Sequence, residues 1–123
     1  MKRALRTASQ TEARREDTDW GCLRWLASQE LTGCKALTVG RVLIKRGYAN
    51  PRHTHPNCQE VLYLLSGRLE HEICAERVIQ DAGDTLVVPA GVAHQAHSVG
   101  DVDADMIVAY DAGKREFRKE TAP

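Results

Sequence analysis

The chain has no excess charge of either sign, because 17 lysine and arginine residues balance 17 aspartate and glutamate residues. A nucleic-acid-binding domain needs a basic surface that neutralises phosphates, so we expect no nucleic-acid partner. No apolar run is long enough to span a bilayer, so we expect no membrane segment. The basic residues 1–6 are followed by acidic residues rather than an apolar stretch. That pattern is not a secretory signal, and we expect a cytoplasmic protein.

The chain also lacks the cysteine pairs of a redox or zinc motif, because no two of its four cysteines are separated by only two residues. Without an export signal, reduced thiols are the expected state. Cys58 lies close to the candidate metal ligands described below, but we interpret it as a small buried apolar residue.

A series of short segments rich in apolar and β-branched residues, separated by glycine, proline and aspartate, predicts an all-β sandwich or barrel. A chain of 123 residues suffices for one such domain and is too short for two. A jelly roll closes this kind of chain with two sheets and little exposed edge. The expected strands are 37–44, 48–55, 60–65, 68–74, 76–80, 85–88, 92–99 and 105–110.

Three regions follow from this pattern. Residues 1–19 are charged and lack a clear period, so we expect an N-terminal arm that is flexible or contacts a partner subunit. Residues 20–112 should form the barrel, and residues 113–123 a charged tail that frays or forms a short helix. A short barrel with exposed sheet edges gains by pairing with a second copy, and we expect a homodimer.

The segment His53-Thr54-His55 is the most informative motif of the chain. Side chains at positions i and i+2 of an extended segment point the same way, so the two imidazoles can share one ion. Pro56 and Asn57 turn the chain, which brings Glu60, the first residue of the next expected strand, back beside them. Two imidazoles and a carboxylate suit a divalent transition metal, namely Mn, Fe, Co, Ni, Cu or Zn.

Glycines flank this motif at a regular spacing. The first block starts at Gly47 and reaches His53-x-His55 after five residues. Glu60 follows after four more residues, and Gly67 after another six. A second block consists of Gly83, five residues, Pro89-Ala90-Gly91, two residues and His94. From about Val39 to about Tyr110 the chain resembles the cupin family, in which two such motifs hold a metal with three histidines and a glutamate.

The resemblance implies an all-β double-stranded β-helix, or jelly-roll barrel, with a divalent metal as cofactor. Carried over to this chain, the metal ligands are His53, His55, Glu60 and His94. The family's second motif usually closes with asparagine, where this chain has Ser98, so one residue lining the pocket departs from the pattern.

Strand alternation from Glu60 predicts that Leu62 and Leu64 point inward and that Val61, Tyr63 and Leu65 point outward. Some cupin lyases use a tyrosine at the position of Leu62, so that reaction is disfavoured.

Few other side chains are candidates for the site. Glu60 is the candidate catalytic base if it detaches from the metal, and Arg41, Tyr110 and Ser98 are candidate substrate contacts. His97, an odd number of residues from His94, should face the opposite way, and we give His71 no role in the site.

Two functions remain open. The resemblance implies a metal-dependent enzyme on a small organic substrate, such as a dioxygenase, a sugar or uronate isomerase, or a lyase. The shortage of further acids and bases favours the alternative, a non-catalytic barrel that binds or senses a small molecule or a metal.

Overall fold

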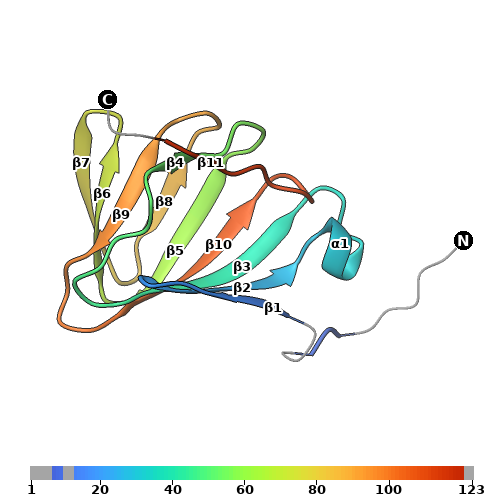
Figure 1. The fold of residues 1–123 in the computed structure, drawn as a ribbon, viewed down its shortest axis with the longest axis horizontal. Helices are drawn as coiled ribbons and strands as arrows, with labels where there is room; N and C mark the ends of the chain where they lie inside the picture. Colours follow the sequence, from blue (N-terminus) through green and yellow to red (C-terminus); the bar gives the residue numbers. More distant parts are fainter. Residues whose placement is uncertain (1–6, 10–12, 121–123) are drawn as a thin grey trace, which may run out of the picture.

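Two antiparallel sheets form the protein in the computed structural model, which describes residues 7–9 and 13–120 (Figure 1). The larger sheet has the order β1 (Arg14–Asp17), β2 (Gly21–Ala27), β3 (Thr38–Ile44), β10 (Ala104–Tyr110), β5 (Glu60–Ser66) and β8 (Thr85–Val88). The smaller sheet has the order β11 (Arg118–Lys119), β4 (His53–Thr54), β9 (His94–Ser98), β6 (Arg68–Ile73) and β7 (Glu76–Asp81). A short helix, α1 (Gln29–Thr32), follows β2. The expected all-β jelly roll is confirmed.

The core lies between the two sheets and follows the alternation of the strands. In β3, β5 and β10 the odd and even positions differ in burial along most of each strand. Leu62 and Leu64 are buried, whereas Val61, Tyr63 and Leu65 are exposed, as strand parity predicts. The buried side chains of the larger sheet pack with Leu69 and Ala96 of the smaller sheet.

Gly67 carries the chain from the larger sheet to the smaller one, because it is the only residue between β5 and β6. Its φ of 88° lies in the left-handed region that favours glycine. A Cβ at this position would stand 2.8 Å from the carbonyl oxygen of Asp103. Gly67, the last residue of the first motif, therefore fixes the point at which the chain leaves β5, the strand that begins with Glu60.

The strand expected over 48–55 is much shorter in the structure, where only β4 and an isolated bridge from Ala49 to His97 occur. Pro51 has no N–H to donate, which interrupts the ladder at that point.

The terminal segments also differ from a simple arm and tail. Within residues 1–19, β1 pairs with β2. Within residues 113–123, β11 pairs with β4. Residues 1–6, 10–12 and 121–123 of these segments lie outside the described residues, and the role of the N-terminal segment in dimerisation stays a prediction.

The described part of the chain contains no helix long and apolar enough to cross a membrane. The cytoplasmic location stays a prediction.

Candidate metal centre

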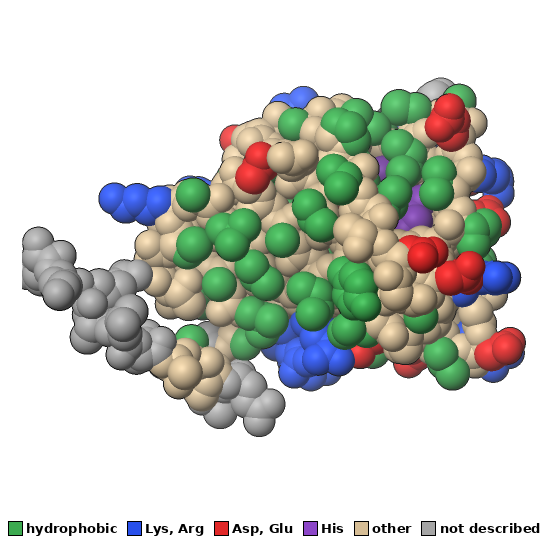
Figure 2. Space-filling model, turned by 180° about the vertical axis from the view of Figure 1, so that it is seen from behind, with side chains coloured by type: hydrophobic (Ala, Val, Ile, Leu, Met, Phe, Trp, Pro, Cys, Tyr) green, Lys and Arg blue, Asp and Glu red, His purple; other side chains and the backbone are tan. Residues whose placement is uncertain are grey.

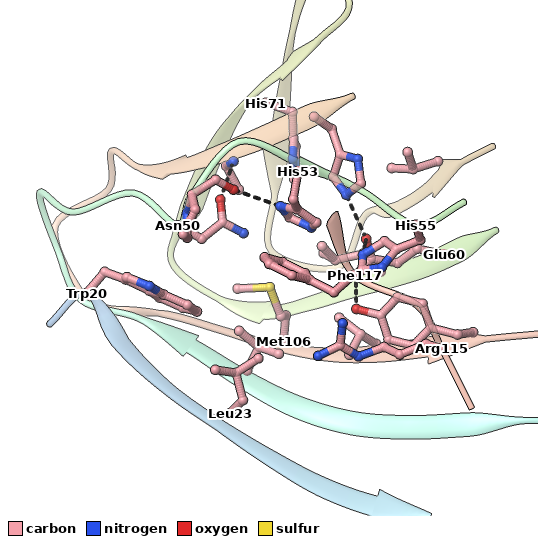
Figure 3. Close-up of a pocket in the computed structure, with 18 residues that line it drawn as sticks. Trp20, Leu23, Asn50, His53, His55, Glu60, His71, Met106, Arg115 and Phe117 are labelled. Carbon is pink, nitrogen blue, oxygen red and sulfur yellow. Dashed lines mark hydrogen bonds and ion pairs between the residues drawn. The ribbon is translucent and has the colours of Figure 1, made fainter. Parts of the chain in front are cut away.

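Four buried side chains converge between the two sheets, and they are the four predicted ligands (Figure 3). His53 and His94 lie opposite each other in the register of β4 and β9, and His55 follows β4 directly. Glu60 begins β5 and reaches the histidines from the larger sheet. One potential ligand atom from each residue lies within 4.8 Å of all the others, so the group can hold a single divalent ion.

Backbone carbonyl groups fix the tautomer of each histidine. Nδ1 lies 2.7 Å from the Pro51 oxygen in His53, 2.8 Å from the Glu116 oxygen in His55, and 2.8 Å from the Val92 oxygen in His94. A carbonyl oxygen only accepts, so each Nδ1 carries the hydrogen and donates it. In the neutral ring this leaves the Nε2 lone pair free, which is how a metal-binding histidine is usually oriented.

One polar atom at the centre lacks the partner that burial requires. His55 Nε2 is buried without a hydrogen-bond partner and lies 3.8 Å from Glu60 Oε1. His94 Nε2 lies 3.1 Å from the same oxygen. Lone pairs and a carboxylate at these distances repel each other unless a proton or a cation lies among them. A divalent transition metal satisfies all of these atoms at once, so the donor set fits such an ion.

Tyr110 holds the carboxylate from the far side. It is paired with Glu60 in the register of β10 and β5, and its hydroxyl donates to Glu60 Oε2 at 2.7 Å. Burial and the negative charge of Glu60 raise the pKa of the Tyr110 phenol well above 10. The hydroxyl therefore stays a neutral donor, and Oε1 is left facing the histidines.

The four groups have different proton affinities when no metal is bound. Burial and the charge of His94 lower the pKa of His53 to about 4, and burial also lowers the pKa of His55. Burial acts against a charged His94, but the hydrogen bond and the charge of Glu60 raise the pKa of His94 overall. Burial raises the pKa of Glu60, but His94, His55 and Tyr110 together lower it to about 2. Of the four groups, His94 is therefore the one whose environment most favours the protonated form.

A small apolar cavity of about 50 Å³ adjoins the four residues, all of which line it. Its walls come mainly from the larger sheet and include Leu23, Leu62, Met106 and Val108. Phe117 covers the histidines, with its ring stacked on His53 at a centroid distance of 4.8 Å (Figure 3). A ligand in this cavity would meet the donor group beside mainly apolar walls.

The sequence did not predict two parts of the site. The buried His71 lines the cavity, and its Nε2 lies 2.8 Å from Gln80 Oε1. Strand parity with the buried Leu69 was the signal that could have placed His71 inward. Arg115 and Phe117 also line the cavity, from a segment expected to be a tail. Phe117 is the one phenylalanine of the chain, and an aromatic residue among charged neighbours was the available signal.

Of the remaining candidate residues, the structure places one in the site and the others outside it. Tyr110 is in the site, whereas Arg41 is not: it forms an ion pair of 2.7 Å with Asp105 outside the cavity lining. Arg41 faces away because it alternates with the buried Gly40 and Val42 of β3. Ser98 is buried but does not line the cavity. His97 is more exposed than its neighbours Ala96 and Ser98, as expected for the opposite face of β9.

Comparisons with known proteins agree with this architecture. Residues 40–110 match the family described as Cupin domain. Germin-like protein 3-8 of Oryza sativa subsp. japonica is 32% identical over 82 residues, which cover 62% of this chain and 36% of that protein. Polyketide synthase CurC of Streptomyces cyaneus is 30% identical over 87 residues, covering 71% and 56%. Oxalate oxidase 2 of Hordeum vulgare is 29% identical over 90 residues, covering 66% and 40%. The chain thus spans between about a third and somewhat over half of these relatives.

Solved structures share the fold at lower identity. The oxalate decarboxylase of Bacillus subtilis at pH 4.6 superposes with a TM-score of 0.81 and 21% identity, over 89% of this chain and 30% of that chain. The oxalate decarboxylase of Lactobacillus farciminis gives a TM-score of 0.82 and 16% identity, over 89% and 34%.

The two histidines of β9 provide the first test of the site. We expect His94→Ala to weaken metal binding by at least about 100-fold, since even a lost partner of a ligand costs roughly 10–100-fold. His97→Ala should change the affinity by less than about twofold, because His97 lies on the other face. Competition with a chromogenic chelator measures both. Equal losses in the two variants would contradict the site.

The pH dependence of metal binding provides the second test. Metal binding must displace the proton of His94, whose pKa is raised above 6.5, so affinity should fall as pH drops through that raised pKa. His53 should compete for protons only near its pKa of about 4. Calorimetry in buffers of different ionisation enthalpy should therefore detect proton release on metal binding below the raised pKa of His94, and none well above it. An affinity unchanged between about pH 8 and about pH 5 would rule out His94 as a ligand.

Proposed function

The chain belongs to the cupin family, and from this premise we propose that it is a metal-dependent enzyme acting on a small organic substrate. The ligands we assign to one divalent transition-metal ion are His53, His55, Glu60 and His94.

The observation that carries the proposal is the position of the cavity. All four donor residues border it, so a molecule in the cavity can approach the ion from the side that the protein leaves open. An open coordination position distinguishes catalytic from closed structural sites. An ion bound there supplies Lewis acidity and, if it is redox-active, electron transfer.

Residues around the ion would exclude water, position the carboxylate and transfer protons. Leu62, Met106 and Phe117 exclude water, which strengthens every electrostatic interaction inside the cavity. The neutral hydroxyl of Tyr110 keeps Glu60 Oε2 in place. Glu60 is the one carboxylate among the residues that line the cavity, so we assign it the role of base at the stage when it detaches from the ion.

The reactions we favour are a dioxygenase-type oxidation and, second, a sugar or uronate isomerisation. Relatives that carry the name oxalate oxidase support an oxidation of a small acid, although this chain covers only 40% of the one from Hordeum vulgare. The alternative is a non-catalytic barrel that binds or senses a small molecule or a metal. It is favoured by the few acid and base groups of the cavity, where His71, Tyr110 and Arg115 are the only ones besides the ligands among the described lining residues.

A metal-resolved screen tests the enzyme proposal. Protein loaded separately with Mn, Fe, Co, Ni, Cu or Zn should convert at least one compound among small organic acids, sugar acids and phenols, tested with and without oxygen. His94→Ala loaded under the same conditions should lose this turnover. A wild type that binds one ion and one small molecule, yet converts nothing, would favour the sensing barrel.

We also propose that the protein is a homodimer that packs through the outer face of the larger sheet. Val61, Tyr63, Val87 and Ile107 are exposed on β5, β8 and β10, and Val61–Val87 and Tyr63–Ile107 are neighbours in the register. Exposed apolar patches of this kind mark interaction surfaces. Hydrophobic side chains also gather on the face seen in Figure 2.

A second copy suits this face because apolar residues occupy its centre. The nearby charges are Arg41, which is paired with Asp105, and Arg24, which lies opposite Arg41 in the register. A copy related by a two-fold axis presents the same apolar residues in return. Sheets pack face to face readily, about 10 Å apart.

Light scattering at micromolar concentration tests the dimer. We expect the mass of two chains for the wild type and of one chain for Tyr63→Lys, since a buried unpaired charge is costly. Ile79→Lys is the matched control, because Ile79 is equally exposed but lies on β7 of the smaller sheet; it should stay dimeric. A monomeric wild type would contradict the proposal.

A further inference from the structure

We propose that Arg115 makes the cavity a binding site for a small carboxylate anion. The inference rests on the proposed function, because the anion would share the cavity with the metal. It concerns the C-terminal strap, which we define as residues 113–120.

The strap is held against the site by a set of hydrogen bonds. Asn57 accepts from the backbone N–H of Glu116 at 2.8 Å and donates to the carbonyl oxygen of Lys114 at 2.9 Å. Further along, β11 pairs with β4, the strand of His53. The backbone of Arg115 is therefore fixed between two anchored neighbours, and its side chain is directed to a defined place.

That place is the border of the cavity (Figure 3), where Arg115 is half-buried and separates it from a second cavity that Trp25 also lines. Its guanidinium carbon lies 4.2 Å from the ring centre of Trp25, 5.4 Å from that of Tyr110 and 5.6 Å from that of Phe117. These contacts hold the group in position by cation–π attraction. Within the described part of the chain, they leave its N–H donors without acceptors.

Arg115 differs in this respect from many arginines of the chain. Within residues 7–9 and 13–120 it has neither an ion pair nor a hydrogen bond from its side chain, although it is partly shielded from water. The arginines that do pair with a carboxylate are Arg14, Arg15, Arg41, Arg68 and Arg77. An unpaired guanidinium at a cavity is a candidate anion-binding group, because its planar fork matches a carboxylate.

The charges around the cavity also favour an anionic ligand. Glu60 is the one acidic residue among those that line it. A divalent ion and Arg115 together exceed this single negative charge, and the apolar walls screen the excess poorly. An anion in the cavity reduces the imbalance, whereas a neutral or cationic ligand does not.

The size of the cavity limits the anion. About 50 Å³ leaves room for roughly three or four water-sized groups, which corresponds to an anion of the size of acetate. A sugar acid would require the strap to move. The inference therefore favours the oxidation of a small acid over the isomerisation of a sugar acid.

Ligand binding to the cobalt-loaded protein tests the proposal without relying on turnover. Acetate and its neutral isostere acetamide are titrated while the visible spectrum of the ion is recorded. We expect acetate to bind the wild type at least about tenfold more tightly than acetamide. Arg115→Met, which keeps an unbranched side chain over Trp25, should lose about tenfold in acetate affinity, and Arg115→Lys should recover part of it. The cobalt affinity should not fall in either variant, because neither substitution removes a metal ligand.

Arg118→Met is the matched control, since Arg118 lies on the same strap but is exposed and outside the cavity lining. It should bind acetate like the wild type. Equal binding of acetate and acetamide to the wild type, or equal losses in the Arg115 and Arg118 variants, would overturn this inference and leave the metal-dependent enzyme intact. A wild type that takes up no cobalt, manganese or other ion would overturn both.

Discussion

The approach of Glu60 to the three histidines is the interaction on which the rest of this site depends. The carboxylate comes from the larger sheet and the imidazoles from the smaller one, so the two sheets must pack closely for the group to form. In isolation the approach is unfavourable, because lone pairs face a carboxylate in a buried space. A shared proton on His94, or a divalent ion, converts this repulsion into attraction. The jelly roll thus holds together a set of atoms that is stable only around a positive charge.

The surrounding residues restrict that group to one arrangement. Three backbone carbonyl groups orient the imidazole rings, and Tyr110 orients the carboxylate. One of those carbonyls belongs to Glu116, so the strap takes part in orienting His55 as well as in placing Arg115. Few side chains are then free to rearrange when an ion binds. Such preorganisation is what a precise metal site requires.

The sequence sufficed to predict the features that depend on local pattern. The spacing of two residues places His53 beside His55, and alternation along β5 separates Leu62 from Tyr63. The second result holds because only one face of β5 is buried. The family spacing added His94, which the structure brings to the same point. These two kinds of signal account for the fold and for the four donor residues.

The remaining features depend on contacts between distant segments, which local pattern does not encode. Arg41 faces outward because the parity of β3 is set by its pairing with β2 and β10. The strap lies on the site because Asn57 and β4 bind it, and a run of charged residues gives no sign of that.

A crystal structure of the metal-loaded protein, with anomalous scattering recorded at the absorption edge of the ion, tests the central claim most directly. The account predicts one peak per chain, at roughly 2.0–2.2 Å from the Nε2 atoms of all three histidines and from an oxygen of Glu60 if the ion is zinc. A peak elsewhere, or one that contacts the histidines while Glu60 turns away, would contradict the account.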